Sequence, residues 1–199
     1  TTNWTYTWTP LTEGPLTIKS HAFDDSYNVE ATGTAPSSNV VDVTITAAVA
    51  PICPCTIWNS ATIPINVAEQ DTNPVELGLK FRAKFDGYIT GIRFYKSTLN
   101  TGTHIGNLWD TSGTNLAQAT FTGETASGWQ QVNFASPVQV TAGTTYIASY
   151  HTSTGHYSED DNFFTSAGVN TYYLEALADG IDGPNGVYAA SSISTFPNS

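Results

Sequence analysis

The chain has 199 residues, a formal net charge of −11, and 12% charged against 12% aromatic residues. This charge excludes a nucleic-acid-binding protein, which needs positive charge to displace counterions from phosphate. No run of about 18 apolar residues is present, so no membrane-spanning helix and no membrane insertion are predicted.

The composition favours an extracellular protein, either secreted or on the cell surface. Thr, Ser, Asn and Gly are abundant, which is typical of secreted β-sandwich proteins whose surfaces are polar without being ionic. The acidic balance is compatible with binding cations or a neutral polymer such as a polysaccharide. The chain begins with Thr1 and not with Met. We therefore expect a processed chain or a piece of a longer one.

Residues 1–50 contain three strand patterns. Residues 4–8 alternate aromatic side chains with threonine, residues 16–23 alternate again, and residues 40–46 are rich in Val and Thr. Alternation with period two predicts strands, but three strands cannot bury a two-sheet core alone. The pattern resembles the last three strands of a bacterial immunoglobulin-like module. This resemblance implies a partial immunoglobulin-like β-module at the N-terminus.

Residues 51–55 are predicted to be a linker, and they include both cysteines of the chain. Cys53 and Cys55 are too close in sequence for an ordinary disulfide bridge. One Cys-X-Cys pair without further Cys or nearby His is also not a zinc site. We interpret the pair as a feature of the domain boundary. A strained local disulfide and a cross-link to a neighbouring chain are the alternatives.

Residues 56–199 are predicted to form a second β-module. Its clearest pattern places Leu77, Leu79 and Phe81 on one face of a half-buried strand, with charged side chains on the other. Turn signals separate the predicted strands, which are residues 77–85, 88–95, 105–110, 116–121, 130–135, 145–151 and 186–189, and a short helical turn is predicted at 173–178. The spacing predicts an all-β fold, an antiparallel β-sandwich of jelly-roll-like arrangement.

Several segments of this module also carry a family resemblance, over residues 55–199. The matching segments are residues 56–58, 75–82, 91–96, 100–106, 121–130, 146–151 and 178–188. They resemble DUF4082, an uncharacterised family of bacterial extracellular domains. The resemblance implies an accessory module of large secreted proteins that also carry immunoglobulin-like repeats and sometimes carbohydrate-active domains.

The sequence departs from this family at its end. Members usually continue past Phe-Pro with a final strand of the type Tyr-Trp-Val-Asp-Val, whereas this sequence stops at residue 199. If that strand belongs to the sandwich, its absence leaves unpaired backbone groups on a neighbouring strand. Residues 4–8 of this chain, the same segment of a neighbouring copy, or an unrelated segment could fill the gap by strand addition.

Acidic and amide side chains near the start of this module suggest calcium. Asp71, Asn73 and Glu76 carry oxygen donors of the kind that calcium prefers, although the spacing matches no EF-hand. Solvated loop charge is the alternative, and Glu76 could instead pair with Arg82. No other cofactor is expected. A catalytic carboxylate pair is not supported, because nothing in the sequence places two acids across a cleft.

Two loop regions combine the side chains that recognise sugars. Aromatic rings stack on sugar C–H faces, while carboxylates and amides bind the hydroxyls. The candidate ligand-binding residues are His104, His151, His156, Tyr157, Asp160, Asp161, Tyr172 and Tyr173. Packing of the rings as a loop core is the alternative for the aromatic residues. Two or three of the histidines on one rim would also make a transition-metal site.

These features predict a non-catalytic module of a larger secreted or cell-surface bacterial protein. No Ser-His-Asp, Gly-X-Ser-X-Gly or His-Glu-X-X-His pattern is present, so the chain is not expected to be an enzyme. Carbohydrate binding or adhesion is the leading expectation, with a polysaccharide or glycan as partner. The alternative is a structural module of a surface filament or adhesin that exchanges strands with neighbouring copies of the chain.

Overall fold

The computed structural model describes residues 18–19, 40–41 and 51–198. By its internal contacts the chain divides into two units, Thr1–Ala50 and Pro51–Ser199. In the first unit, β1 (Ile18–Lys19) and β2 (Val40–Val41) form an antiparallel pair. Both lie within predicted strands. The predicted strand at 4–8, its proposed gap-filling role and the immunoglobulin-like resemblance lie outside the described residues.

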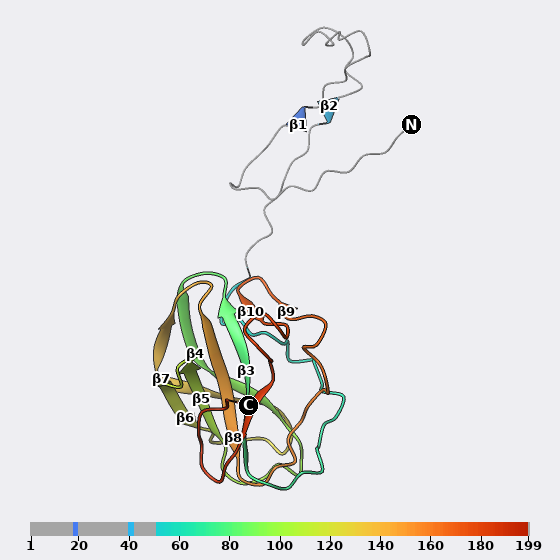
Figure 1. The fold of residues 1–199 in the computed structure, drawn as a ribbon, viewed down its shortest axis with the longest axis vertical. Helices are drawn as coiled ribbons and strands as arrows, with labels where there is room; N and C mark the ends of the chain where they lie inside the picture. The colour runs from blue at the N-terminus through green and yellow to red at the C-terminus, as the bar shows by residue number, and fades with distance from the viewer. Residues whose placement is uncertain (1–17, 20–39, 42–50, 199) are drawn as a thin grey trace. The chain divides into compact units, whose positions relative to one another are not determined.

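The second unit is an antiparallel β-sandwich, as the alternation pattern predicted (Figure 1). Its described residues contain strands and no helix. The strands are β3 (Val75–Ala83), β4 (Gly87–Lys96), β5 (Ile105–Asp110), β6 (Asn115–Thr120), β7 (Gly128–Val140), β8 (Thr145–Thr152), β9 (Val169–Asn170), β10 (Leu174–Ala176) and β11 (Val187–Ala190). The seven predicted strands match β3 to β8 and β11, with shifted ends.

Strand β3 is the centre of the larger sheet. The sheet has the order β6-β5-β8-β3-β10-β9, and β11 also pairs with β3. On one side β3 pairs with β8 from Val75 to Arg82. On the other side its partner changes along its length, because β11 pairs with Val75–Gly78 and β10 with Phe81–Ala83. The smaller sheet consists of β4 and β7, whose register shifts between Ile89 and Gly91.

The core lies between the two sheets and consists mainly of aromatic and aliphatic side chains of alternating strand positions. Its buried members are Phe81, Ala83, Ile92, Phe94, Leu108, Phe121, Phe134, Val140, Tyr146 and Tyr150. The ring of Phe94 stacks on Tyr150 at 4.2 Å and meets Phe121 edge-on at 4.9 Å. Each buried ring contributes about 2–3 kcal/mol of hydrophobic stabilisation. This core holds the strands as a rigid support for the loops.

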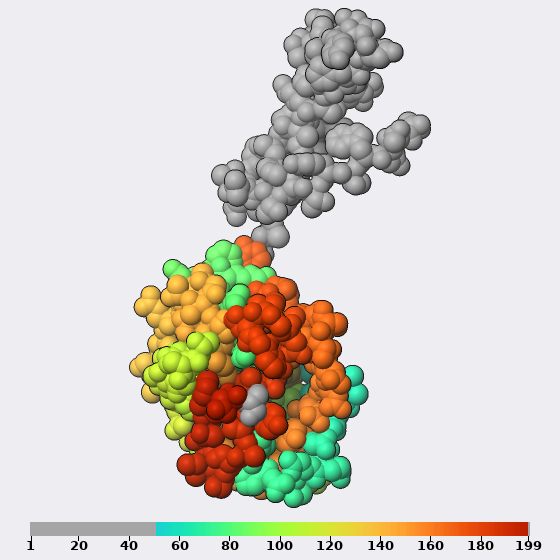
Figure 2. Space-filling model, in the orientation of Figure 1, coloured from blue at the N-terminus to red at the C-terminus, as the bar shows by residue number. Residues whose placement is uncertain are grey.

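The opposite face of the larger sheet is also covered. Trp109, Ile147 and Val187 form a second buried cluster, against which Phe196 packs. The rings of Trp109 and Phe196 lie 5.7 Å apart. In the space-filling view the red C-terminal residues lie on the surface that faces the viewer (Figure 2). The C-terminal segment, residues 191–198, therefore acts as a cover on the outer side of the sheet.

Two local predictions need correction. The helical turn predicted at 173–178 is wrong, because Leu174–Ala176 forms β10 and pairs with the end of β3. The strand pairing satisfies backbone groups that a lone helical turn would leave open. The cysteines are not merely a boundary feature: Cys53 and Cys55 form a disulfide with each other, which was one of the alternatives.

Candidate functional site

His104 is buried in the sandwich and cannot contact a ligand at the surface. Its Nδ1 lies 2.8 Å from Glu124 Oε1, and its Nε2 lies 2.8 Å from Asn100 Oδ1. Lys96 contacts the same carboxylate, with Nζ 2.8 Å from Oε2. Burial lowers the pKa of His104, and the neighbouring Glu124 opposes this shift. The arrangement is a structural network that ties two loops together, and both ring nitrogens of His104 are engaged within it.

His151 is likewise buried, although it is close in sequence to exposed loop residues. It lies on β8 opposite Glu76 and Ile105 of the neighbouring strands. Its Nε2 lies 3.1 Å from the carbonyl oxygen of Ser191. His151 therefore supports the C-terminal cover and is not available to a ligand. No group of three or more His, Cys, Asp or Glu that could hold a metal is found among the described residues.

The loop after β8 holds four more of the predicted ligand residues, His156, Tyr157, Asp160 and Asp161, and it contacts residues 65–71. His156 Nδ1 lies 2.9 Å from Glu69 O, and His156 N donates to Asp71 O at 2.7 Å. Asp160 Oδ1 accepts a hydrogen bond from the backbone N–H of Ile65. Tyr157 packs partly against the core, while Asp161 is exposed. Much of this loop is thus engaged in holding residues 65–71 in place.

The structure separates the roles of the three predicted calcium ligands. Asp71 Oδ1 accepts hydrogen bonds from the backbone and side chain of Asn73, at 2.9 and 2.6 Å. Glu76, in contrast, is fully buried in the sheet. Its carboxylate accepts hydrogen bonds from Asn107, Ser149, Ser194 and Thr195. Glu76 is therefore not the partner of Arg82, whose guanidinium contacts Asp182, and its oxygens are already engaged by these four residues.

An acidic pair, Glu69 and Glu159, lies beside this loop. Asn66 Nδ2 donates to Glu69 Oε2 at 2.6 Å, and Asn66 and Glu159 form an isolated β-bridge. Asn66 Nδ2 also lies 3.5 Å from Glu159 Oε1, so one amide group contacts both carboxyl groups. Burial and the hydrogen bond with Glu69 raise the pKa of Glu159 to about 7. The backbone N–H of Gln70 is the first of several hydrogen bonds that lower the pKa of Glu69.

Tyr172 and Tyr173 lie with Phe85 in an exposed aromatic cluster. Phe85 stacks on Tyr172 with ring centroids 5.9 Å apart, and Tyr173 meets Phe85 edge-on at 5.9 Å. Phe85 is 54% exposed and Tyr172 is 43% exposed. The β3–β4 turn supplies Phe85, and the β9–β10 connection supplies the tyrosines. Two contacts join these elements, since Lys84 N donates to Tyr173 O at 2.8 Å and Lys84 Nζ to Thr171 O at 2.7 Å.

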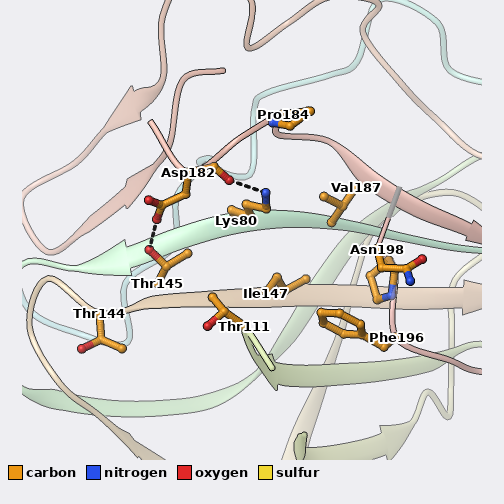
Figure 3. A pocket seen from close by; sticks show the side chains of 11 residues that line it. Lys80, Thr111, Thr144, Thr145, Ile147, Asp182, Pro184, Val187, Phe196 and Asn198 are labelled. Atoms are coloured by element: carbon orange, nitrogen blue, oxygen red, sulfur yellow. Dashed lines mark hydrogen bonds between the residues drawn. The ribbon is translucent and has the colours of Figure 1, made fainter. Parts of the chain in front are cut away.

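A groove of about 710 Å³ lies on the outer side of the larger sheet (Figure 3). Its polar side is organised by Asp182, whose carboxylate lies 2.6 Å from Arg82 Nη2 and accepts a hydrogen bond from Thr145. Hydrogen bonds from Thr145 and Arg82 lower the pKa of Asp182. The other lining residues are Lys80, Thr111, Thr144, Ile147, Pro184, Val187, Phe196, Pro197 and Asn198. The groove combines hydroxyl groups with apolar walls.

Neither Phe85 nor the groove around Asp182 was predicted from the sequence as part of a binding site. Phe85 ends an alternating strand pattern, where an aromatic residue is normally assigned to the core. The signal that could have found it is the Asp86-Gly87 turn that follows directly, because a residue at the end of a sheet projects beyond the core. No local pattern connects Asp182 with Arg82, which are 100 positions apart.

Comparisons with known proteins show to which family this chain belongs. A comparison with curated proteins gives no match. The described part of the chain contains no helix that is long and apolar enough to cross a membrane. A family model described as "Domain of unknown function (DUF4082)" matches residues 61–199, which is more than half of the chain. This match confirms the resemblance that the strand motifs indicated, and the chain belongs to the DUF4082 family.

Proposed function

We propose that this chain is a non-catalytic module of a larger extracellular bacterial protein, and that it binds carbohydrate through Phe85, Tyr172 and Tyr173. The observation that carries the proposal is the exposed stack of Phe85 on Tyr172. Contact of adjacent aromatic rings with water is unfavourable, and a contiguous exposed apolar patch is typical of a surface that binds a ligand or partner. Sugars present apolar C–H faces that such rings bind.

Charge supports a neutral glycan as the ligand. The net charge of −11 repels polyanionic chains at moderate ionic strength. Lys84 lies next to Phe85, but its ammonium group already donates to Thr171 O. Recognition at the aromatic cluster would therefore depend on stacking and on hydrogen bonds from neutral groups, as expected for an uncharged polysaccharide.

The acidic pair supports a non-catalytic role. Glycosidases of the retaining type separate their two carboxyl groups by about 5 Å, and inverting enzymes by more. The amide of Asn66 instead donates to both Glu69 Oε2 at 2.6 Å and Glu159 Oε1 at 3.5 Å. Both carboxyl groups are thus engaged with a loop side chain, which favours a structural role.

A glycan array followed by isothermal titration calorimetry tests the proposal. We expect the wild-type chain to bind a neutral glycan, and Tyr172→Ala and Phe85→Ala to weaken binding at least about tenfold, which corresponds to about 1.4 kcal/mol. Tyr88→Ala is the matched control, because Tyr88 is an exposed tyrosine on β4 outside the aromatic cluster. No binding to any glycan would reject the function. Binding lost in Asp182→Asn but kept in Tyr172→Ala would move the site to the groove.

A second candidate function is structural, and the smaller sheet favours it. Within the described residues, β4 and β7 pair only with each other, which leaves one edge of each strand unpaired. An open strand edge is a template for strand addition from a neighbouring chain. A concentration-dependent increase in molar mass by light scattering, together with no glycan binding, would support this function over the first. A constant monomer mass would reject it.

A further inference from the structure

Four polar side chains meet beneath the C-terminal cover, on the outer face of the larger sheet. They are Glu76 of β3, Asn107 of β5, Ser149 of β8 and Ser194 of the cover. Glu76, Asn107 and Ser149 are buried, and Ser194 is half-buried. We call this group the Glu76 cluster. Neither the proposed glycan site nor the sheet pairing requires it, so its chemistry calls for an explanation.

Glu76 lies between two potential reaction partners. Its Oε2 accepts a hydrogen bond from Ser194 Oγ at 3.0 Å, and its Oε1 accepts one from Asn107 Nδ2 at 2.9 Å. A carboxylate in this position can take a proton from the serine hydroxyl and give it to the amide nitrogen. This is the role of a general base that later acts as a general acid.

The amide of Asn107 is polarised like a carbonyl in an oxyanion hole. Its Oδ1 accepts hydrogen bonds from Asn115 Nδ2 at 3.0 Å and from Gln118 Nε2 at 2.8 Å. Two fixed donors on one carbonyl oxygen stabilise the negative charge that develops there when a nucleophile attacks. The same amide has its Nδ2 2.8 Å from Ser194 Oγ. A nucleophile and a base thus both contact the nitrogen of the amide whose carbonyl carbon is the electrophile.

We propose that Ser194 and Asn107 form an intramolecular ester with the release of ammonia. Ser194 Oγ attacks Asn107 Cγ and gives its proton to Glu76. Negative charge collects on Asn107 Oδ1, where Asn115 and Gln118 stabilise it. The Cγ–Nδ2 bond then breaks, Glu76 returns the proton to the leaving nitrogen, and ammonia departs. The new Oγ–Cγ bond replaces the amide bond, and no oxidant or external reagent takes part.

The surroundings support this reaction. Burial raises the pKa of Glu76, against the hydrogen bonds from Ser149, Ser194 and Asn107, and so makes it a stronger base than an exposed carboxylate. Trp109 Nε1 donates to Ser149 Oγ at 2.7 Å, which orients the remaining hydroxyl on Glu76. Trp109, Ile147 and Phe196 cover this side of the sheet and would shield the ester from water. Ser194 Oγ now lies against Asn107 Nδ2, so the Ser194 side chain must move to face Cγ before attack, while Asn107 Oδ1 keeps its hydrogen bonds from Asn115 and Gln118.

The ester would fasten the C-terminal cover to β5. In the structure the cover is held here by noncovalent contacts, which include the hydrogen bonds of Ser194 Oγ and Thr195 N to Glu76 and of Asn107 Nδ2 to Ser194 Oγ. A covalent bond would keep residues 191–198 over the sheet even when these hydrogen bonds break. Formation of the ester does not depend on glycan binding, so mass measurements on the chain test it whether or not the chain binds a glycan.

Intact mass spectrometry of the purified, denatured full chain tests the ester. After reduction of the Cys53–Cys55 disulfide, we expect a mass lower by one ammonia than the sequence requires. Hydroxylamine should then cleave the ester, free the Ser194 hydroxyl and leave a hydroxamate on Asn107, so that the mass rises by one hydroxylamine. Ser194→Ala should show the full mass of its own sequence. Ser191→Ala, a matched change in the same segment, should keep the deficit, because Ser191 Oγ bonds Ile193 O and lies outside the Glu76 cluster.

Fragmentation of a digest decides between an ester and other losses of ammonia. The ester requires one species in which the peptide of Asn107 is joined to that of Ser194. A succinimide within a single peptide would overturn the proposal, as would a wild-type chain of full mass after prolonged incubation at neutral pH. Glu76→Gln should also prevent the deficit. If Glu76→Gln fails to fold, Ser194→Ala still provides the comparison.

Discussion

Asn185 pairs with Lys80 as though its side-chain amide were the backbone of a strand. Lys80 N donates to Asn185 Oδ1 at 2.7 Å, and Asn185 Nδ2 donates to Lys80 O at 3.0 Å. This contact lies where the partner of β3 changes from β10 to β11. The same amide donates to Leu177 O at 2.6 Å. The side chain of Asn185 thus supplies hydrogen bonds to backbone groups that lie between the two short strands.

Asn185→Ala should lower the free energy of unfolding by about 2–4 kcal/mol, because it removes the partners of Lys80 N–H and of the Leu177 carbonyl. Lys80 O keeps its hydrogen bond from Leu177 N. Urea denaturation followed by tryptophan fluorescence measures the change. Asn133→Ala is the control. Asn133 is exposed, and its side-chain amide accepts a hydrogen bond from the side chain of Gln131. An equal, small loss in both variants would show that water replaces the Asn185 amide without cost.

Gly78→Ala should destabilise the chain by about 1–3 kcal/mol through overpacking. A methyl group on Gly78 would lie 2.9 Å from Ser149 Cβ and 3.0 Å from Ala148 O on the adjacent strand. Gly87→Ala is the matched control at the start of β4, where nothing lies within 4 Å of the added carbon. Thermal unfolding of both variants checks the difference. A Gly78→Ala variant as stable as Gly87→Ala would mean that β3 and β8 move apart easily.

The alternation of side chains predicted most strands of the second unit, because period two depends only on neighbouring residues. Leu77 and Phe81 do face the core. The other face of the same strand was assigned to solvent, and for Glu76 this was wrong. The C-terminal segment that covers Glu76 contacts it across 118 positions. Long-range contacts of this kind leave no periodic signal in the sequence.

The candidate site could be predicted only in part, for a related reason. Tyr172 and Tyr173 were found because aromatic residues crowd one segment, and the structure places them with exposed Phe85. His104 and His151 were chosen by residue type and position in a loop or at a strand end. Their burial depends on how the strands and the loop at Asn100 pack together. Local sequence does not reveal this packing.

Glu124→Gln should cost more stability than Asp182→Asn. The Lys96–Glu124 pair has side chains only 11% and 12% exposed, and His104 bonds the same carboxylate. Removing its charge leaves Lys96 enclosed without a counterion, at a cost of about 2–4 kcal/mol. The Arg82–Asp182 pair is 29% and 34% exposed, so water screens it and its loss should cost about 1 kcal/mol or less. Urea denaturation ranks the two variants, and the reverse order would contradict the assignment.

The pair of Glu69 and Glu159 should make stability depend on pH near neutrality. The folded state raises the pKa of Glu159 from 4.5 to about 7, so between these values the folded chain binds more protons than the unfolded chain. The free energy of unfolding therefore decreases as the pH rises through this range. Glu69 has a lowered pKa, so its own contribution is lost only in acid.

Carbon-detected NMR titration of the Glu159 carboxyl group measures this shift directly. Glu69→Gln should move the pKa of Glu159 towards 4.5, because it removes the hydrogen-bonding and charged neighbour that raises it. Asp71→Asn is the matched control, because Asp71 acts on Glu69 and Tyr157 and is not among the main causes of the Glu159 shift. A wild-type Glu159 that titrates near 4.5 would contradict the effect of burial and of Glu69 on this carboxyl group.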